Sequence, residues 1–211
     1  MTDKFKSDFI AGGSVQNSLR VAQWIMKKPN VAVFFGCVGE DNYCNILQTR
    51  ARADGVNVRY QTKKDVSTGK CAVLITGKHR SLIADLAAAN CFSEDHIMDK
   101  ENNKFVQEAE FYYISGFFLT VSPASIMNVA MKANEMNRPL IMNLSAPFIS
   151  QFFKEPLMAV MPYVDILFGN ESEALTFANE QNFGTENLKE IGKILVLNCN
   201  DFLKIINCLF F

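Results

Sequence analysis

The chain has 211 residues, of which 49% are hydrophobic and 20% are charged, with a net charge near −1. This composition excludes an intrinsically disordered chain, and it lacks the basic excess of a nucleic-acid-binding protein. We therefore expect one substantial buried core and no nucleic-acid partner.

The two ends of the chain show no pattern typical of secretion or membrane insertion. Residues 1–10 alternate charges with single aromatic residues, unlike a signal peptide. Residues 194–211 are apolar but contain Asp201 and Lys204, each of which costs roughly 2.5 to 3.5 kcal/mol inside a bilayer. The six cysteines form no CxxC pair, which indicates free thiols in a reducing compartment. We expect the cytoplasm as the location, the nucleus being a further candidate, and no membrane partner.

The first half of the chain begins with a helix, a strand and a second helix. Apolar residues recur at helical spacing over 15–28, directly after Gly12-Gly13-Ser14. The continuous apolar run 31–38 is typical of a strand covered on both faces of a parallel sheet, and a helix is expected over 42–53.

Residues 56–76 show a different pattern. Val56, Val58 and Tyr60 alternate with polar residues, and Thr68-Gly69 is a turn signal before the apolar run 71–76. We interpret this segment as an antiparallel ribbon with one exposed face, inserted either as a lid or as a small accessory sheet; closure of a lid would exclude water from reacting phosphates.

The second half returns to alternating strands and helices, which predicts a doubly wound, mostly parallel sheet of the α/β class. Ligands bind such sheets beyond the carboxyl ends of the strands. The expected strands are 111–114, 139–144 and 164–168, and the expected helices are 122–137, 149–161 and 170–180. Ser122 and Pro123 are predicted as the N-cap and the first position of the helix 122–137.

Two motifs near the N-terminus each allow a structural or a functional interpretation. Gly12-Gly13-Ser14 is either an ordinary turn with a Ser N-cap, or a helix mouth whose free N–H groups receive an oxygen-rich ligand, with Asn17 one turn inside the helix. The segment FGCVGED, residues 35–41, is either a tight connection with Asp41 as the next N-cap or part of the same site.

Two further motifs are equally ambiguous. Arg80 precedes a row of small and aliphatic residues, which could be helix packing beside a solvated Arg or a phosphate clamp beside an apolar pocket. Asn170 and Glu173 are spaced as a capping box, but the same pair could organise a hydrated Mg²⁺, which needs only one or two carboxylates.

Several long segments in this order resemble the ribokinase-like carbohydrate and nucleoside kinases, and within them the adenosine kinases. They are AGGSVQNS, FFGCVGED, HRSLIADLAAANC, YISGFFLTVSPAS, NLSAPFISQFF and MPYVDILFGNESEA, and the likeness covers about residues 5–192. The resemblance implies an incomplete ribokinase-like domain over 1–192, a lid ribbon at about 56–76, and a divergent apolar tail at 193–211.

The resemblance also implies an activity, its substrates and its site. It implies ATP- and Mg²⁺-dependent phosphorylation of the 5′-hydroxyl of adenosine, giving AMP for purine salvage. Arg80 would lie near the transferring phosphate, and Asn170 with Glu173 would hold magnesium through water. The substrate-binding residues would be Gly12, Gly13, Ser14 and Asn17 at the ribose, and Cys71, Leu82, Ala84, Leu86, Phe117 and Phe148 at the adenine.

The sequence departs from the family pattern at three points. Cys44 stands where a glycine is usual, and the chain starts near the first signature, without a counterpart of the family's opening strand and ribose-gripping aspartate. The DTxGAGD motif, which carries the general base and an anion-stabilising turn, is absent. We therefore expect impaired catalysis, with a non-catalytic nucleoside-binding or interaction isoform as the alternative. The tail 193–211 would come from an alternative exon, a retained intron or a gene-model error.

Overall fold

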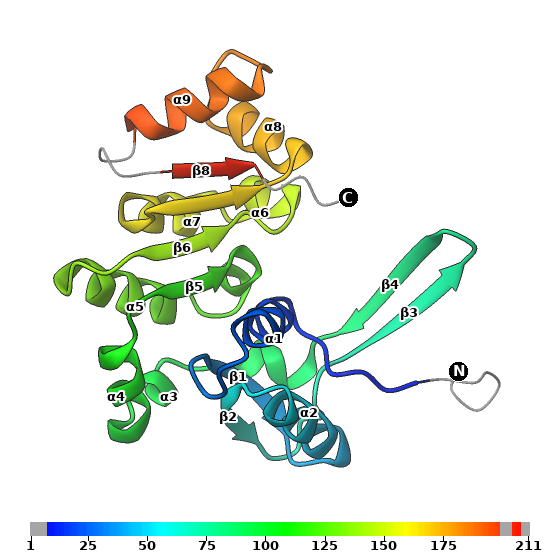
Figure 1. Ribbon diagram of the computed structural model, residues 1–211. Helices are drawn as coiled ribbons and strands as arrows, with labels where there is room; N and C mark the ends of the chain where they lie inside the picture. The colour runs from blue at the N-terminus through cyan, green and yellow to red at the C-terminus, as the bar shows by residue number, and fades with distance from the viewer. Residues whose placement is uncertain (1–7, 199–203, 208–211) are drawn as a thin grey trace. The chain divides into compact units, whose positions relative to one another are not determined.

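The computed structural model describes residues 8–198 and 204–207. The chain divides into two compact units, Met1–Phe92 and Ser93–Phe211. Each unit combines helices with parallel strands, which confirms the α/β class (Figure 1).

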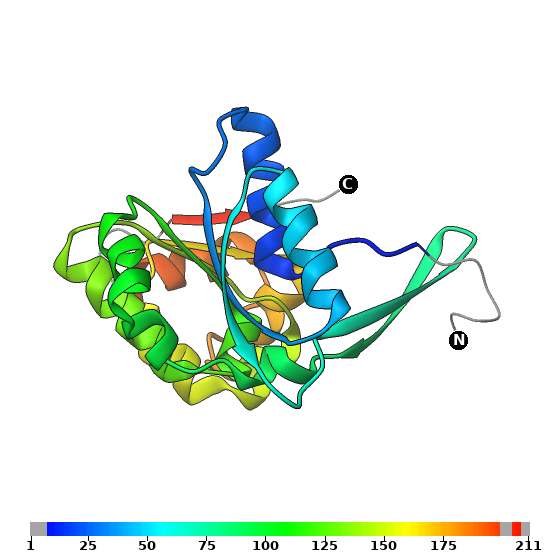
Figure 2. The same ribbon diagram turned by 90° about the horizontal axis from the view of Figure 1, so that it is seen from below.

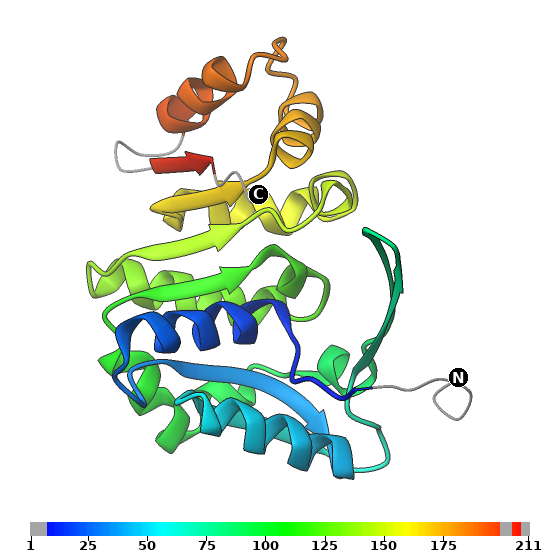
Figure 3. The ribbon, with the colours of Figure 1, turned by 45° about the vertical axis from the view of Figure 1, so that its right-hand side comes forward.

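The first unit is built around a pair of parallel strands. Strand β1 (Val33–Gly39) pairs with β2 (Asn57–Lys63), and helix α2 (Asn42–Ala53) connects them. Helix α1 (Ser14–Met26) and α2 both contact β1, as Figure 3 shows. The core of this unit consists of the buried Ala51, Val56 and Val58, with Leu19, Phe34 and Tyr60 packed against them.

The antiparallel ribbon exists, but the predicted bounds of 56–76 are wrong. Residues 57–63 form β2 in the parallel pair, and the ribbon consists of β3 (Lys70–Thr76) and β4 (His79–Asp85). The alternation at Val56 and Val58 arises because one face of β2 covers the core. An alternating pattern reports burial of one face and does not identify the partner strand.

The segment after Arg80 is a strand and not the helix that its small residues would allow. Residues up to Asp85 form β4, and a short 3₁₀ helix, η2 (Ala87–Cys91), follows and contacts β1. In Figure 2 the two strands of the ribbon extend from the body of the first unit.

The second unit contains a parallel sheet with the strand order β5-β6-β7-β8. Along the chain, helix α5 connects β5 to β6. It begins as predicted, with Ser122 as its N-cap and Pro123 at its first position. The bounds are β5 Tyr112–Ser115, β6 Leu140–Asn143, β7 Ile166–Gly169, β8 Lys204–Asn207, α3 Asp95–Met98, α4 Lys100–Glu108, η3 Gly116–Thr120, α5 Pro123–Glu135 and α8 Glu171–Glu180.

The single helix expected over 149–161 is wrong, because this segment forms two short helices. Helix α6 (Pro147–Phe152) ends before α7 (Lys154–Val160), and Phe153 between them has a non-helical backbone. A proline has no N–H to donate within a helix, so Pro156 is tolerated in the first turn of α7 but would interrupt a continuous helix. A 3₁₀ turn, η4 (Met161–Tyr163), completes the segment.

The described part of the C-terminal segment continues the alternation of helix and strand. Helix α9 (Leu188–Asn198) runs through position 193 and buries Ile191 and Leu195, and β8 pairs in parallel with β7. Among the described residues, no helix has the length and apolar character needed to cross a membrane.

Candidate functional site

The start of α1 differs from an ordinary capped helix. Its N-cap is Gly13, with φ 105° and ψ 129°, so the interpretation of Ser14 as the N-cap is wrong. Within the described residues no side chain caps this end. The first N–H groups of a helix have no intrahelical acceptor, and at this end of α1 they lie beside the exposed Ser14 and Asn17.

Two side chains from inside α1 hold the turn that precedes it. Gln16 Nε2 donates to the carbonyl oxygen of Gly12 at 3.0 Å, and the hydroxyl of Tyr60 on β2 donates to Gln16 Oε1. Arg20 Nη1 donates to the carbonyl oxygen of Ala11 at 2.8 Å. The sequence motif did not reveal these supports, because a glutamine beside a glycine turn is usually solvated and Tyr60 is distant along the chain.

Arg20 is itself fixed by a carboxylate. Its Nε lies 2.5 Å from Asp54 Oδ2, at the end of α2, and its Nη1 lies 3.4 Å from Asn17 Oδ1. The turn before α1 is therefore connected through side chains both to β2 and to the end of α2.

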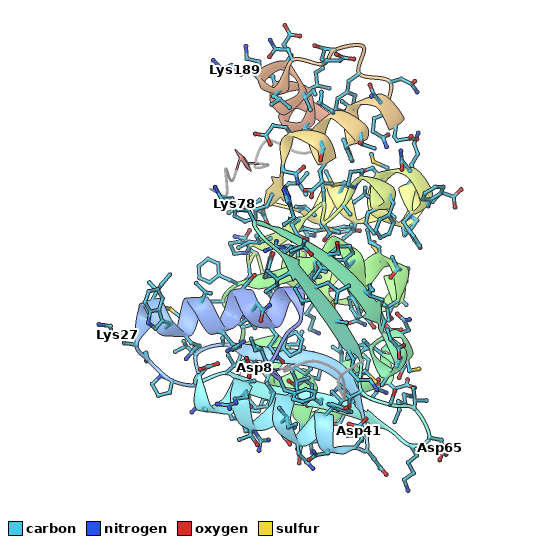
Figure 4. The ribbon with its side chains drawn as sticks, turned by 90° about the vertical axis from the view of Figure 1, so that its right-hand side faces the viewer. Asp8, Lys27, Asp41, Asp65, Lys78 and Lys189 are labelled. Carbon is cyan, nitrogen blue, oxygen red and sulfur yellow. The ribbon has the colours of Figure 1, made fainter. Side chains whose placement is uncertain are left out.

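Asp41 connects the end of β1 to the base of the ribbon. As predicted, it is the N-cap of α2, and its Oδ1 accepts from the Cys44 N–H at 2.9 Å. The carboxylate also accepts from the N–H of Thr68 at 2.8 Å and from its hydroxyl at 2.7 Å. Figure 4 shows Asp41 near the base of the ribbon and Lys78 at its far end.

The hydrogen bonds of Asp41 also determine its ionisation. Burial by itself would raise the pKa of this carboxyl, but the hydrogen bonds from Thr68 and Cys44 outweigh burial and hold the pKa below its ordinary value. A backbone N–H of Gly39 donates to the Thr68 hydroxyl at 3.0 Å, which completes the network.

One face of the ribbon collects the residues that the resemblance assigns to the nucleoside. The register pairs Cys71 with Ala84, Val73 with Leu82 and Ile75 with Arg80, and side chains of directly paired residues share a face. The face is exposed along its length, with Leu82 60% and Ile75 78% accessible. It therefore presents a strip of apolar side chains that ends at one guanidinium.

In the second unit, Phe117 and Phe148 lie together. Their ring centroids are 6.0 Å apart at an interplanar angle of 34°, and Phe148 also contacts Phe153. Both rings are partly exposed, at 41% and 39%. The structure thus brings together the two aromatic residues that the resemblance assigns to the adenine.

Polar groups at the ends of β5 and β6 support this aromatic pair. The N–H of Phe117 donates to Ser145 Oγ at 3.1 Å, and this hydroxyl donates to Asn143 Oδ1 at 2.6 Å. Asn143 Oδ1 also accepts from the N–H of Gly116 at 3.0 Å. Sequence reasoning did not assign Asn143 and Ser145 a role, although polar residues after a buried strand are a usable signal.

Asn170 and Glu173 form a complete capping box at the start of α8. Asn170 Oδ1 accepts from the Glu173 N–H at 2.9 Å, and Glu173 Oε2 accepts from the Asn170 N–H at 3.1 Å. Glu173 Oε1 accepts from Asn170 Nδ2 at 2.9 Å, and the Glu173 side chain is buried. The structural interpretation of this motif is confirmed.

The donor set at α8 fits magnesium only through water. Each Glu173 oxygen already accepts one hydrogen bond, and within the described ranges no three His, Cys, Asp or Glu side chains cluster as metal ligands. Mg²⁺ keeps several waters in most protein sites, so a carboxylate with lone pairs left over can hold its hydration shell.

The four described cysteines agree with the prediction of free thiols. They are Cys37, Cys44, Cys71 and Cys91, while Cys199 and Cys208 lie outside the described residues. Burial raises the pKa of the Cys37 thiol to about 11, so this residue stays protonated at neutral pH.

The fold and these motifs define a class of protein. Residues 4–201 match the pfkB family carbohydrate kinases, and the chain belongs to that family. The match extends beyond residue 192, where we expected the likeness to end.

Relatives within this class are adenosine kinases. Adenosine kinase 2 of Arabidopsis thaliana is 47% identical over 191 residues, which are 90% of this chain and 55% of the relative. Adenosine kinase of Dictyostelium discoideum is 41% identical over 86% of this chain and 53% of the relative. The chain therefore spans about half the length of these curated relatives.

Solved structures give the same result. Anopheles gambiae adenosine kinase in complex with P1,P4-di(adenosine-5) tetraphosphate superposes with a TM-score of 0.91 at 51% identity, over 97% of this chain and 62% of that one. Schistosoma mansoni adenosine kinase with adenosine in an occluded loop conformation gives a TM-score of 0.90 at 29% identity, over 98% of this chain and 62% of that one. These matches confirm the ribokinase-like fold.

Proposed function

We propose that the protein is an ATP-dependent adenosine kinase that transfers the γ-phosphoryl group of ATP to the 5′-hydroxyl of adenosine, and that these 211 residues contribute the nucleoside-facing part of its site. The observation that carries the proposal is the start of α1, where N–H groups without a side-chain cap lie beside Ser14 and Asn17. Such groups suit the ribose hydroxyls of a nucleoside.

The remaining candidate residues have roles that fit their surroundings. The strip on the ribbon formed by Cys71, Leu82 and Ala84 supplies apolar contact for a flat base, and Leu86 follows directly after β4. In the second unit, the Phe117–Phe148 pair supplies partly exposed aromatic surface of the kind that suits a flat base. Arg80, at the end of the strip, can bind a phosphate through two parallel N–H groups.

ATP and magnesium are part of the proposal. Magnesium would be held through water at Glu173, whose carboxylate accepts a hydrogen bond from the Asn170 side chain, and it would neutralise charge on the phosphates of ATP. The assignments of residues to the adenine and to the ribose are taken from the resemblance. We also propose purine salvage as the role and the cytoplasm as the location.

Phosphoryl transfer also requires a group that accepts the proton of the 5′-hydroxyl. The 211 residues contain no DTxGAGD motif, which supplies that base in the family. We therefore expect this chain by itself to bind adenosine but to form AMP slowly. AMP formation within about tenfold of an intact adenosine kinase, a difference of about 1.4 kcal/mol in the barrier, would contradict this expectation.

The two faces of the ribbon allow a matched test of the nucleoside site. Leu82 and Ile83 are adjacent and similarly exposed, at 60% and 55%, but they lie on opposite faces. If the Cys71–Leu82–Ala84 face covers the base, Leu82→Ser should weaken adenosine binding about tenfold in calorimetry, as expected for roughly 1.4 kcal/mol of lost apolar contact. Ile83→Ser should change it less than about twofold. Equal effects would refute the assigned face.

A further inference from the structure

Gln16 lies in the first turn of α1, in an environment that is unusual for a glutamine. Its side chain is only 1% exposed, although glutamine is mostly found at the surface. Both ends of its amide are used: Nε2 donates to the Gly12 carbonyl oxygen at 3.0 Å, and Oε1 accepts from the Tyr60 hydroxyl. A buried amide with both ends bonded fixes the groups that it joins.

The bond to Gly12 determines which way the turn presents its N–H groups. In a planar trans peptide the N–H points opposite to the C=O. Because the Gly12 carbonyl oxygen faces Gln16, the N–H of Gly13 faces away from the body of α1. The Ala11 carbonyl oxygen faces Arg20 in the same way, so the N–H of Gly12 also points away.

Tyr60 gives this arrangement a fixed reference. It lies on β2, next to the core of the first unit, and burial raises the pKa of its hydroxyl, so it remains a donor at all ordinary pH values. Gln16 therefore connects a glycine turn, whose backbone can adopt many conformations, to a strand that packs against the core.

We infer that Gln16, anchored by Tyr60, is a positioning residue that aims the backbone N–H groups of Gly12 and Gly13 at the ribose hydroxyls of the nucleoside. The inference rests on the proposed function, because it needs a nucleoside at the start of α1. It assigns the specificity for a hydroxyl-bearing sugar partly to a side chain that does not touch the ligand.

The same helix offers a matched control. Gln23 is also buried, at 4% exposure, and its amide also bonds at both ends, to the Lys28 carbonyl oxygen at 2.7 Å and the Ala32 N–H at 3.1 Å. These bonds lie at the other end of α1. Gln23→Met and Gln16→Met therefore remove the same chemistry from similar surroundings, but only the second change releases the glycine turn.

The test compares two ligands in calorimetry, adenosine and 2′,3′-dideoxyadenosine, which lacks the 2′- and 3′-hydroxyls of the ribose but keeps the 5′-hydroxyl and the base. For Gln16→Met we expect adenosine to bind about tenfold more weakly and the dideoxy ligand to bind as before, so that the ratio of the two dissociation constants changes about tenfold. This is the effect of losing hydrogen bonds between the turn and the ribose hydroxyls. Gln23→Met should lower the melting temperature and leave that ratio unchanged. A ratio unchanged in both variants would overturn the inference.

A second variant keeps the test decisive if Gln16→Met does not fold. Tyr60→Phe keeps Gln16 but removes its anchor, and we expect the same ratio to change by about threefold. If the wild-type chain discriminates the two ligands and Tyr60→Phe leaves the ratio of their dissociation constants unchanged, the inference is overturned. A wild-type chain that binds neither ligand would overturn the proposed function together with the inference.

Discussion

Two helices of this chain begin in opposite ways. Helix α8 is capped at its start by its own residues, since Asn170 and Glu173 exchange hydrogen bonds between side chains and backbone. Helix α1 begins at Gly13 without a side-chain cap among the described residues, and the side chains around it hold carbonyl oxygens instead.

The difference teaches which helix start is ready for a ligand. At α8 the polar groups satisfy one another, so a metal must bind through water or displace existing hydrogen bonds. At α1 the side chains of Gln16 and Arg20 bond the carbonyl oxygens of the turn, which leaves its N–H groups for a ligand. A self-satisfied cap contributes stability, whereas an open one contributes binding.

The largest effect should follow from a substitution in the turn at the start of α1. Gly13→Ala forces a side chain onto a backbone with φ 105°, where strain costs about 1 to 3 kcal/mol. If the turn rotates to relieve this strain, the N–H groups lose their direction, so we expect adenosine affinity to fall by about ten- to a hundredfold in calorimetry.

Gly184 provides the control for Gly13. It also has a positive φ, of 70°, and an added Cβ would meet open space, but it lies in a loop before α9. Gly184→Ala should cost stability and leave adenosine affinity unchanged. Equal losses of affinity in both variants would mean that strain alone, and not the direction of the turn, explains the result.

An intermediate effect is expected at the start of α2, where Asp41 is both a cap and a link to the ribbon. Asp41→Ala should lower the free energy of unfolding by about 1 to 2 kcal/mol at neutral pH. Asp41→Asn retains an acceptor for the helix and should lose less. Urea titrations of both variants would measure the difference.

The pH dependence of Asp41 separates its charge from its role as a cap. Because its pKa in the folded chain is below the ordinary 3.8, its stabilisation is complete above that value and is lost as the pH falls through the lowered pKa. Both variants should therefore lose less stability than the wild type on acidification below about pH 4. Parallel acid curves for all three proteins would contradict this.

The smallest effect should come from the self-capped helix. Asn170→Ala removes the N-cap acceptor of α8 and should cost about 1 kcal/mol of stability in urea titrations, with adenosine affinity unchanged when magnesium is absent. Ser172→Ala is the control, because its exposed hydroxyl only donates to Asn170. A loss of adenosine affinity in Asn170→Ala without magnesium would erase the contrast between the two helix starts.

The sequence predicted features that depend on neighbouring residues. The bounds of α2, the caps of α5 and α8 and the role of Asp41 all follow from spacings of a few residues, where cap chemistry is decisive. The residues assigned to the ribbon face were predicted from resemblance, and the register places Cys71, Leu82 and Ala84 on one face.

Features that depend on distant residues could not be predicted in the same way. The structure pairs β2 with β1. The sequence could not show this, because burial of Val56 and Val58 beside Ala51 of α2 produces the same alternation as a half-exposed ribbon. The pairing of Gln16 with Tyr60 spans 44 positions, and nothing in either local sequence announces it. The turn before α1 was therefore recognised as a motif, while its support was not.

Nuclear magnetic resonance of the backbone amides tests the central contrast most directly. On addition of adenosine to the chain of 211 residues, we predict that the largest shifts occur at the amides of Gly12, Gly13 and Ser14, while those of Asn170 and Glu173 stay in place. Unchanged amides at the start of α1, with shifts confined to α8, would contradict the assignment of the nucleoside site to the open helix.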